Sequence, residues 1–243
     1  MIVLFTDFGL SGPYTGQVMA VLHQEAPLVP VISLFANAPS ARPLPSAYLL
    51  AAYGAWFPAG TLLLGVVDPG VGSARRAVIA DADGRLYVGP DNGLFDIAMR
   101  RARSARLWEI AWRPGPLSAS FHGRDLFAPV AARLARGEPP SSLAQPAEDR
   151  SGKRGWPDDL AEIVYIDHYG NALTGLRGAV VPADAQLVAG GRAIAAASTF
   201  SAVPAGQAFW YVNSNGLAEI AVNSERADEA LGLAIGTTVT VEA

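Results

Sequence analysis

Short apolar runs alternate with longer amphipathic stretches through the first half of the chain. A short apolar run predicts a buried strand, whereas apolar residues repeated on one helical face predict a helix. Strands that alternate with helices are typical of an α/β fold with a largely parallel sheet. The expected strands cover residues 2–5, 29–35 and 62–67, and the expected helices cover residues 14–24, 46–57, 94–103 and 125–136.

Two local signals add detail to this pattern. The dipeptide Asp83-Gly84 separates the apolar runs 77–80 and 86–88, and it predicts a two-residue type I′ hairpin turn. Asp125 is the expected N-cap of the last helix, because a carboxylate accepts hydrogen bonds from free N–H groups of the first turn. Gly137 follows the end of that helix, where glycine is favoured.

The pattern changes after residue 137, where Pro, Ser and charged residues become frequent. We expect an α/β domain with a mostly parallel sheet over residues 1–140, and a linker over residues 141–160. Residues 161–243 are expected to form a small all-β barrel domain, for which a sandwich is the other permitted architecture. Its β-like runs cover residues 161–166, 187–188, 208–212, 218–222 and 237–241, and residues 227–233 are the one possible helix.

Composition narrows the class of protein. The chain has 243 residues, of which 51% are hydrophobic and 16% charged, so a globular fold with a sizeable core is expected. The net charge of -4 does not favour nucleic acid, which requires a basic face. The absence of Cys excludes disulfides, thiolate metal ligands and a Cys nucleophile. No apolar run reaches the roughly 18 residues of a membrane span and no signal peptide is evident, so a cytoplasmic protein is expected.

Two segments place charged or titratable residues on turns next to apolar runs. Asp68 follows the expected strand 62–67 and opens a Pro- and Gly-rich turn that ends near Arg75. His122 lies before the expected N-terminus of a helix, a position that attracts anions. Ligands of α/β proteins bind beyond the carboxyl ends of the strands. A carboxylate, a guanidinium and an imidazole there predict a site for a small polar or anionic reactant.

Each of these residues also has a purely structural interpretation. Asp, Pro and Gly favour turns, a single His is more often structural than catalytic, and Arg76 is expected to be a solvated surface charge. Asp7 follows the first strand, where it either caps a turn or accepts both hydroxyls of a ribose. The sequence contains no His pair at metal-ligand spacing, no P-loop and no Gly-x-Ser-x-Gly elbow, so these three hydrolase classes lack support.

The second half of the chain offers two further candidate segments. Residues 167–171 close the first strand of that half, and residues 213–216 precede the run 218–222. Both are compatible with plain β-turns, and Asn215-Gly216 is a strong hairpin signal. Alternatively, Asp167 supplies a carboxylate for an amine, while amide and hydroxyl groups serve a carboxylate and a purine edge.

Taken in order, six segments resemble the S-adenosyl-L-methionine hydroxide adenosyltransferase family, whose members are S-adenosylmethionine hydrolases related to the enzymes that make fluoro- and chloro-adenosine. The resemblance spans nearly the whole chain. It implies an α/β domain followed by a β-barrel domain, and no metal or organic cofactor. It also implies a homotrimer that binds its substrate between the first domain of one subunit and the second domain of the next. The segments are residues 6–9, 67–72 with Arg75, 89–94, 121–125, 170–171 and 213–216.

The resemblance also implies a function for individual residues. The expected reaction is hydrolysis of S-adenosyl-L-methionine to adenosine and L-methionine, with a halide adenosyltransferase and a catalytically idle binding protein as alternatives. Halogenating relatives lack the catalytic Asp and His, so these residues favour water as the nucleophile. The expected catalytic residues are Asp68, Arg75 and His122. The expected substrate-binding residues are Asp7 for the ribose, Asp167 and Ser214 for the methionine, Asn171, Val222 and Ser224 for the adenine, partly through backbone groups, and their neighbours Tyr169 and Asn215.

One segment departs from the family pattern. The family usually has Asp-Ile-Ser-His followed by two prolines and an Asp after its second strand, whereas residues 33–45 here read differently. That loop covers part of the substrate in relatives. Its divergence is expected to change the local shape of the pocket.

Overall fold

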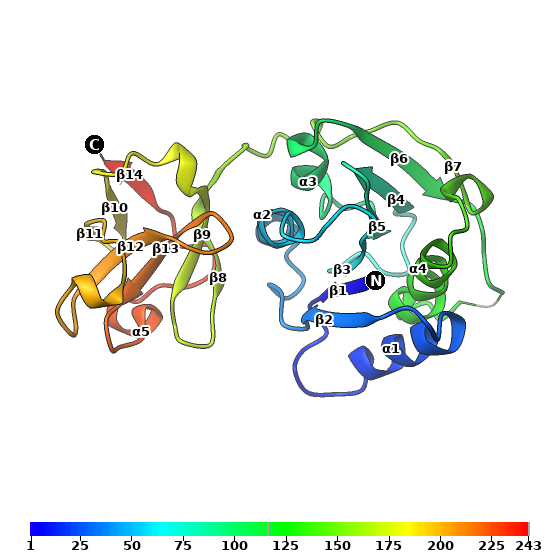
Figure 1. Ribbon diagram of the computed structural model, residues 1–243, viewed down its shortest axis with the longest axis horizontal. Helices are drawn as coiled ribbons and strands as arrows, with labels where there is room; N and C mark the ends of the chain where they lie inside the picture. Colours follow the sequence, from blue (N-terminus) through cyan, green and yellow to red (C-terminus); the bar gives the residue numbers. More distant parts are fainter. Residues whose placement is uncertain (116, 243) are drawn as a thin grey trace. The chain divides into compact units, whose positions relative to one another are not determined.

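The computed structural model describes residues 1–115 and 117–242, which divide into unit 1 (Met1–Gly155) and unit 2 (Trp156–Ala243) (Figure 1). A seven-stranded sheet in the order β2-β1-β3-β5-β4-β6-β7 forms the centre of unit 1. Strands β2, β1, β3 and β5 pair in parallel, and the other pairs are antiparallel. The strands are β1 (Ile2–Thr6), β2 (Val31–Phe35), β3 (Leu62–Val66), β4 (Ala77–Ala82), β5 (Arg85–Pro90), β6 (Ala105–Ile110) and β7 (Ala144–Pro146).

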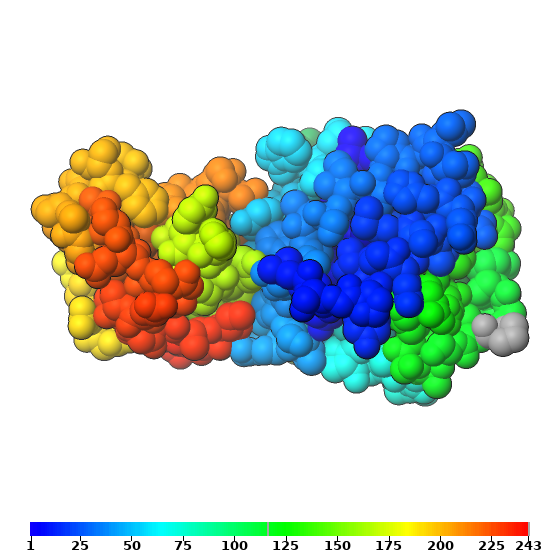
Figure 2. Space-filling model, turned by 90° about the horizontal axis from the view of Figure 1, so that it is seen from below, coloured from blue at the N-terminus to red at the C-terminus, as the bar shows by residue number. Residues whose placement is uncertain are grey.

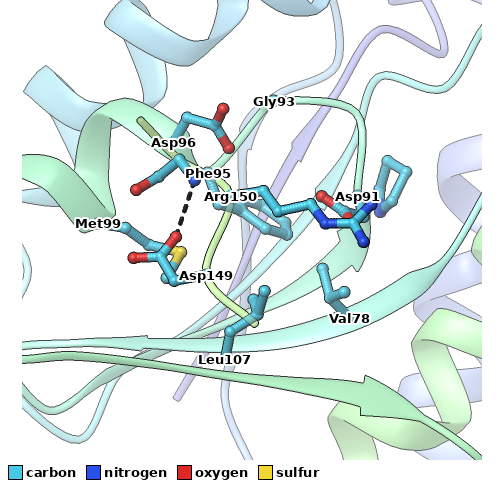
Figure 3. A pocket seen from close by; sticks show the side chains of 11 residues that line it. Val78, Asp91, Gly93, Phe95, Asp96, Met99, Leu107, Asp149 and Arg150 are labelled. Carbon is cyan, nitrogen blue, oxygen red and sulfur yellow. Dashed lines mark hydrogen bonds between the residues drawn. The ribbon is translucent and has the colours of Figure 1, made fainter. Parts of the chain in front are cut away.

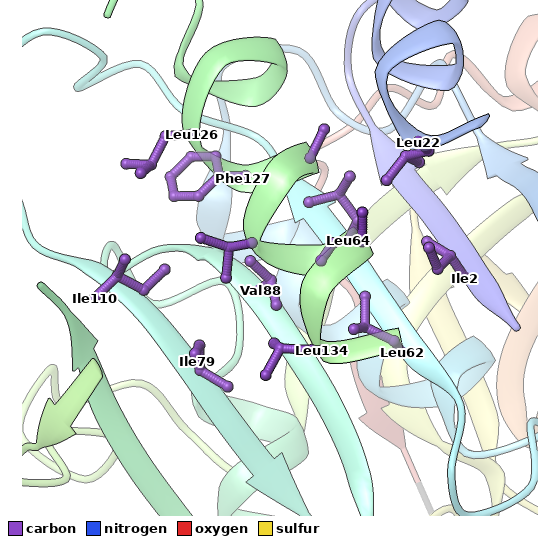
Figure 4. Close-up of a cluster of buried hydrophobic side chains, with 14 of the residues drawn as sticks. Ile2, Leu22, Leu62, Leu64, Ile79, Val88, Ile110, Leu126, Phe127 and Leu134 are labelled. Atoms are coloured by element: carbon purple, nitrogen blue, oxygen red, sulfur yellow. The ribbon is translucent and has the colours of Figure 1, made fainter. Parts of the chain in front are cut away.

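Helices cover both faces of this sheet (Figure 1). Helix α1 (Tyr14–Glu25) packs with α4 (Ala128–Ala135), and α2 (Pro43–Gly54) packs with α3 (Asp96–Arg101). Strands β1 and β3 are buried throughout, as expected for central strands of a sheet covered on both faces. The core under α4 joins Phe127 and Leu134 to apolar side chains of β3, β4 and β5 (Figure 4). The α/β fold with a mostly parallel sheet is therefore confirmed.

The hairpin prediction is confirmed and the N-cap prediction is wrong. Asp83 and Gly84 both have positive φ, and Ala82 pairs with Arg85 across them, as a type I′ turn requires. Asp125 lies inside a π-helical turn, η1 (Gly123–Phe127), that precedes α4. Its carboxylate accepts a hydrogen bond from the Ser118 N–H at 2.9 Å rather than from the first turn of the helix.

Several boundaries differ from the sequence prediction. Helix α2 begins at Pro43, three residues early, because proline is tolerated at the first position of a helix. Strand β6 was not predicted, since its Arg and Glu interrupt the apolar pattern. Strand β7 lies within residues 141–160, the expected linker, and pairs with β6; a short 3-10 turn (Pro140–Ser142) precedes it.

Unit 2 contains two antiparallel sheets. Its strands form a four-stranded sheet, in the order β12-β13-β9-β8, and a three-stranded sheet, in the order β11-β10-β14. Strands β9 and β11 were not predicted. Within the described residues these are two separate sheets, so a closed barrel is not confirmed. The remaining elements are β8 (Leu160–Ile166), β9 (Ala172–Arg177), β10 (Gln186–Ala189), β11 (Arg192–Ile194), β12 (Ala208–Val212), β13 (Leu217–Val222), α5 (Ala227–Leu231), β14 (Thr240–Glu242) and 3-10 turns at Gly178–Val180 and Phe200–Ala202.

None of the helices in the described parts of the chain has the length and apolar character needed to cross a membrane.

Candidate active site

Asp68 and Arg75 form an ion pair within one loop that follows β3. The Arg75 Nε donates hydrogen bonds to both carboxylate oxygens of Asp68, at 2.8 and 2.9 Å, and its Nη2 makes a further contact with Oδ2. The two side chains are only 10% and 5% exposed, so water screens the pair weakly. The Arg75 guanidinium also lies over the Phe127 ring, at 5.1 Å. Arg75 therefore has one fixed position in the loop.

His122 joins this pair from a distant part of the chain. Its Nδ1 lies 3.1 Å from the Arg75 Nη2. Arg can only donate, so Nδ1 accepts and the neutral ring carries its proton on Nε2. Burial and the Arg75 charge lower the pKa of His122 below its ordinary value, which keeps the ring neutral at pH 7. The site thus contains a carboxylate, a guanidinium and an N–H donor.

The loop between Asp68 and Arg75 is shaped by its own hydrogen bonds. The Ser73 hydroxyl donates to the Gly70 carbonyl at 2.7 Å and accepts from the Arg75 N–H at 3.3 Å. Gly72 has a φ of +79°, and a Cβ at this position would lie 2.5 Å from the Ala119 carbonyl oxygen. Only glycine fits there, because the loop runs directly against the segment that leads to His122.

Asp7 leaves the same edge of the sheet as Asp68. Strands β1 and β3 are parallel neighbours with Thr6 opposite Val66, so both carboxylates follow the carboxyl ends of adjacent strands. The Ala41 N–H donates to Asp7 Oδ2 at 2.8 Å. Burial and the nearby Asp68 charge raise the pKa of Asp7 against the effect of this hydrogen bond. The divergent loop 33–45 therefore contacts the carboxylate that is expected to bind ribose.

Aromatic rings lie beside these polar groups. Phe8, Tyr14 and Phe121 form a cluster with centroid distances of 5.4–6.2 Å. Phe8 follows Asp7, and Phe121 precedes His122. The segment from β1 into α1 lies at the surface of unit 1 next to η1 and α4, dark blue beside green in Figure 2. This cluster supplies an apolar border for the site.

In unit 2, Asp167 organises the turn that follows β8. Its Oδ1 accepts hydrogen bonds from the N–H groups of Tyr169 and Asn171, both at 2.9 Å, and its Oδ2 accepts from Asn171 Nδ2 at 3.1 Å. Asn171 is buried, whereas Tyr169 is 74% exposed. The structure therefore brings these three predicted residues together, with Asp167 acting as the acceptor that shapes the turn.

The other predicted residues of unit 2 lie at both ends of β13. Ser214 and Asn215 are in the turn before it, where Asn215 Nδ2 donates to the Ser214 hydroxyl at 3.3 Å. Val222 is only 2% exposed and belongs to the core, and its carbonyl accepts a hydrogen bond from the Glu225 N–H at 3.3 Å. Ser224 follows, exposed, with a φ of +67°.

Glu219 is a buried polar residue that the sequence analysis missed. Its carboxyl oxygens accept hydrogen bonds from the Tyr211 hydroxyl at 2.5 Å and from Asn213 Nδ2 at 2.8 Å. Burial raises its pKa, and Asp167 adds to this rise. Its position in the middle of the apolar run 217–222 is the sequence signal that could have predicted a buried carboxyl group. Glu219 links the turn 213–216 to the neighbourhood of Asp167.

The prediction that Arg76 is a solvated surface charge is wrong. Its side chain is 18% exposed, and its Nε donates to Asp91 Oδ2 at 2.7 Å. The partner lies on the turn after β5, and proximity of this kind cannot be deduced from local sequence.

In the part of the chain that the structure describes, no group of three or more His, Asp and Glu side chains converges as metal ligands would.

Comparison with known proteins connects these features. Residues 2–144 match the family model described as SAM hydroxide adenosyltransferase N-terminal domain, and residues 161–240 match its C-terminal domain. The chain is 41% identical to an (R)-S-adenosyl-L-methionine hydrolase of Thermus thermophilus, over 98% of both chains. It is 36% identical to another of Salinispora arenicola, over 98% of this chain and 96% of the relative.

Solved structures have the same fold. An uncharacterized conserved protein of Thermotoga maritima is 27% identical, superposes with a TM-score of 0.89 and covers 100% of both chains. A conserved hypothetical protein of Thermus thermophilus is 37% identical, with a TM-score of 0.78 over 99% of this chain and 98% of that chain.

Proposed function

The chain belongs to the SAM hydroxide adenosyltransferase family and hydrolyses S-adenosyl-L-methionine, and we propose that the reaction takes place at Asp68, Arg75 and His122. Water attacks the ribose C5′ carbon, and the bond between C5′ and the sulfonium sulfur breaks. The products are adenosine, L-methionine and a proton. The leaving group is a neutral thioether, so it needs no general acid.

The observation that carries this proposal is the simultaneous contact of Arg75 with Asp68 and His122. A guanidinium beside the reacting water stabilises a hydroxide-like oxygen through charge-assisted hydrogen bonding. The His122 Nε2–H donates a second hydrogen bond to that oxygen. The Asp68 carboxylate has about four lone-pair sites, so it can accept a hydrogen bond from the water, and then its proton, while it still binds Arg75.

The substrate is proposed to bind through groups of both units. Asp7 accepts the ribose hydroxyls, and the apolar rings beside it exclude bulk water. Asp167 and Ser214 bind the amino-acid part of the substrate. Asn171 and the backbone near Val222 and Ser224 contact the adenine, and Tyr169 and Asn215 complete the set. This division is supported by the family resemblance and by the polar character of both turns.

The assembly is proposed to be a homotrimer with its sites at the subunit interfaces. The protein is proposed to be located in the cytoplasm. The residues proposed for one substrate molecule belong to two units of the chain, and a closed ring brings such surfaces together in every interface.

Hydrolysis in 18O-labelled water tests the chemistry directly. We expect the purified protein to convert S-adenosyl-L-methionine to adenosine that carries the label on its 5′-hydroxyl, because attack at C5′ requires it. Adding chloride should yield no chloro-nucleoside, which separates hydrolysis from halide transfer. Unlabelled adenosine would exclude displacement by water at C5′, and the absence of any turnover would leave only a binding protein.

A further inference from the structure

The turn after β5 holds the beginning of the catalytic loop. Asn92 Nδ2 donates a hydrogen bond to the Val67 carbonyl at 2.8 Å, directly before Asp68. The Asn92 Oδ1 accepts from the Leu94 N–H at 3.2 Å, so the amide is held in one orientation. A side-chain bond to a backbone carbonyl fixes the peptide that leads into Asp68.

The same turn holds the end of the catalytic loop. The Asp91 N–H donates to the Arg76 carbonyl at 3.0 Å, and the Asp91 carboxylate pairs with the Arg76 side chain. The Arg76 carbonyl also accepts from the Arg75 Nη1 at 3.4 Å. One carbonyl oxygen therefore connects Asp91 to the guanidinium that contacts Asp68 and His122.

The turn is itself firmly anchored. A Cβ on Gly89 would lie 2.1 Å from the Gly65 carbonyl oxygen, so β5 approaches β3 too closely for a side chain at residue 89. Arg154, near the end of unit 1, donates to Asp91 Oδ1 at 3.1 Å and to Asp96 Oδ2 at 3.0 Å. Asp91 and Asp96 also line a pocket with residues of the closing segment of unit 1 (Figure 3).

We propose that Asp91 and Asn92 are positioning residues for the hydrolysis, because they clamp both ends of the loop that carries Asp68 and Arg75. This inference rests on the proposed function. Asn92 sets the peptide before Asp68. Asp91 holds Arg76 through its N–H and through its carboxylate, and the Arg76 carbonyl contacts the Arg75 guanidinium. Neither residue touches the reacting atoms. Their effect is on the distance between the carboxylate and the guanidinium, to which a reaction of positioned water is sensitive.

The test compares Asn92→Asp, Asn92→Ala and Asp91→Asn with the wild-type enzyme. Asn92→Asp keeps the shape of the side chain but cannot donate to Val67. A misplacement of about 1 Å costs on the order of a hundredfold in rate, so we expect kcat to fall roughly tenfold to a hundredfold. KM should change less than about threefold, because the substrate-binding groups are untouched.

Arg85→Ala is the matched control. Arg85 begins β5, the strand whose other end leads to Asp91, and it donates to the carbonyls of Phe57 at 2.6 Å and Ala55 at 3.2 Å. Removing these bonds also costs stability, but it leaves the catalytic loop intact. We expect a lowered melting temperature with wild-type kcat.

The pH dependence of kcat supplies a readout that stability alone does not move. His122 is surrounded by Arg75, Asp68, Arg113 and Asp125, and the Arg75 charge contributes to its lowered pKa. A loosened Arg75 lowers this pKa less, so the acid limb of the rate profile should shift to higher pH in Asp91→Asn.

Three outcomes distinguish the possibilities. Wild-type kcat in folded Asn92→Asp and Asp91→Asn overturns the positioning inference. So does an equal loss of kcat in Arg85→Ala, since the effect would then be general destabilisation. An inactive wild-type enzyme refutes the proposed function instead. Should Asn92→Ala fail to fold, the isosteric Asn92→Asp and Asp91→Asn still decide the question.

Discussion

Two adjacent arginines at residues 75 and 76 serve different partners. Arg75 contacts Asp68 and His122, whereas Arg76 pairs with Asp91. The guanidinium is planar and presents five donors, so each side chain binds a carboxylate and still has donors for a second group. At the residue scale, the two arginines are distinguished by the carboxylate that each one binds.

We expect Arg75→Lys to lower kcat by roughly tenfold to a hundredfold or more. An ammonium cannot reproduce the bidentate contact with Asp68 and reach His122 at the same time, and a charged hydrogen bond is worth about 1.5–3 kcal/mol. Initial-rate kinetics on S-adenosyl-L-methionine measure the effect. Arg106→Lys, at the exposed ion pair with Asp81, is the control and should match wild type. An unchanged kcat in Arg75→Lys would contradict the assignment of Arg75.

The pH profile should reflect a neutral His122. Its folded pKa lies below the ordinary value of about 6.5, so the ring is uncharged at neutral pH and gains a proton only as the pH falls through the lowered value. A proton on Nδ1 would oppose the Arg75 donor. We therefore expect kcat to be constant near pH 7 and to decline only below about pH 6.5. An acid limb centred above pH 6.5 would show that the pKa of His122 is not lowered in the folded protein.

Asp7→Ala should weaken substrate binding rather than the chemical step. A ribose hydroxyl pair loses its charged acceptor, which corresponds to roughly 1.5–3 kcal/mol, or a tenfold to hundredfold weaker affinity. Isothermal titration with S-adenosyl-L-methionine, in a His122→Ala background to prevent turnover, measures it. Equal affinity with and without Asp7 would remove this residue from the ribose site.

At the scale of elements, the edge of the sheet that carries the proposed active site depends on the close approach of β3 and β5. Gly65 and Gly89 lie opposite each other, one register step beyond the Leu64–Val88 pair. A Cβ on Gly89 would meet the Gly65 carbonyl oxygen, and a Cβ on Gly65 would meet the Phe95 ring. The two strands therefore deliver Asp68 and the turn of Asp91 and Asn92 side by side.

Gly89→Ala should destabilise unit 1 by about 3 kcal/mol or prevent folding, because the added methyl collides with a backbone carbonyl that cannot move without breaking the sheet. Gly16→Ala is the opposite case. Gly16 is exposed on α1 with open space around it, so alanine should stabilise by about 0.5–1 kcal/mol. Chemical denaturation measures both. A Gly89→Ala protein as stable as wild type would contradict the close approach.

At the scale of the whole molecule, the proposed substrate contacts are divided between unit 1 and unit 2. An assembly in which each site combines units from two subunits makes a specific prediction. His122→Ala and Asp167→Ala should each be inactive alone, yet coexpressed subunits should regain activity. In a mixed trimer, the intact unit 1 of one subunit meets the intact unit 2 of another.

Light scattering should accompany this experiment and give three times the 25.3 kDa chain mass. If mixing restored no activity although mixed oligomers formed, the site would lie within one subunit. A fully active monomer would exclude the interfacial site altogether.

Much of the fold follows from the sequence because its signals are local. The apolar runs of β1 and β3 and the pattern of α1 are properties of neighbouring residues, and so is the Asp83-Gly84 turn. The resemblance across six short segments also identified the family, which the comparisons confirm.

Other features depend on residues that are distant along the chain. Arg76 is partly shielded from water and pairs with Asp91 from the turn after β5, and Asp125 contacts Ser118 instead of capping a helix. Strand β6 is polar in sequence because it pairs beyond the parallel core, where its partners β4 and β7 specify it. The local sequence pattern indicates the secondary structure that a segment favours. The partner of a charged side chain or of a strand depends instead on which segments the folded chain brings together.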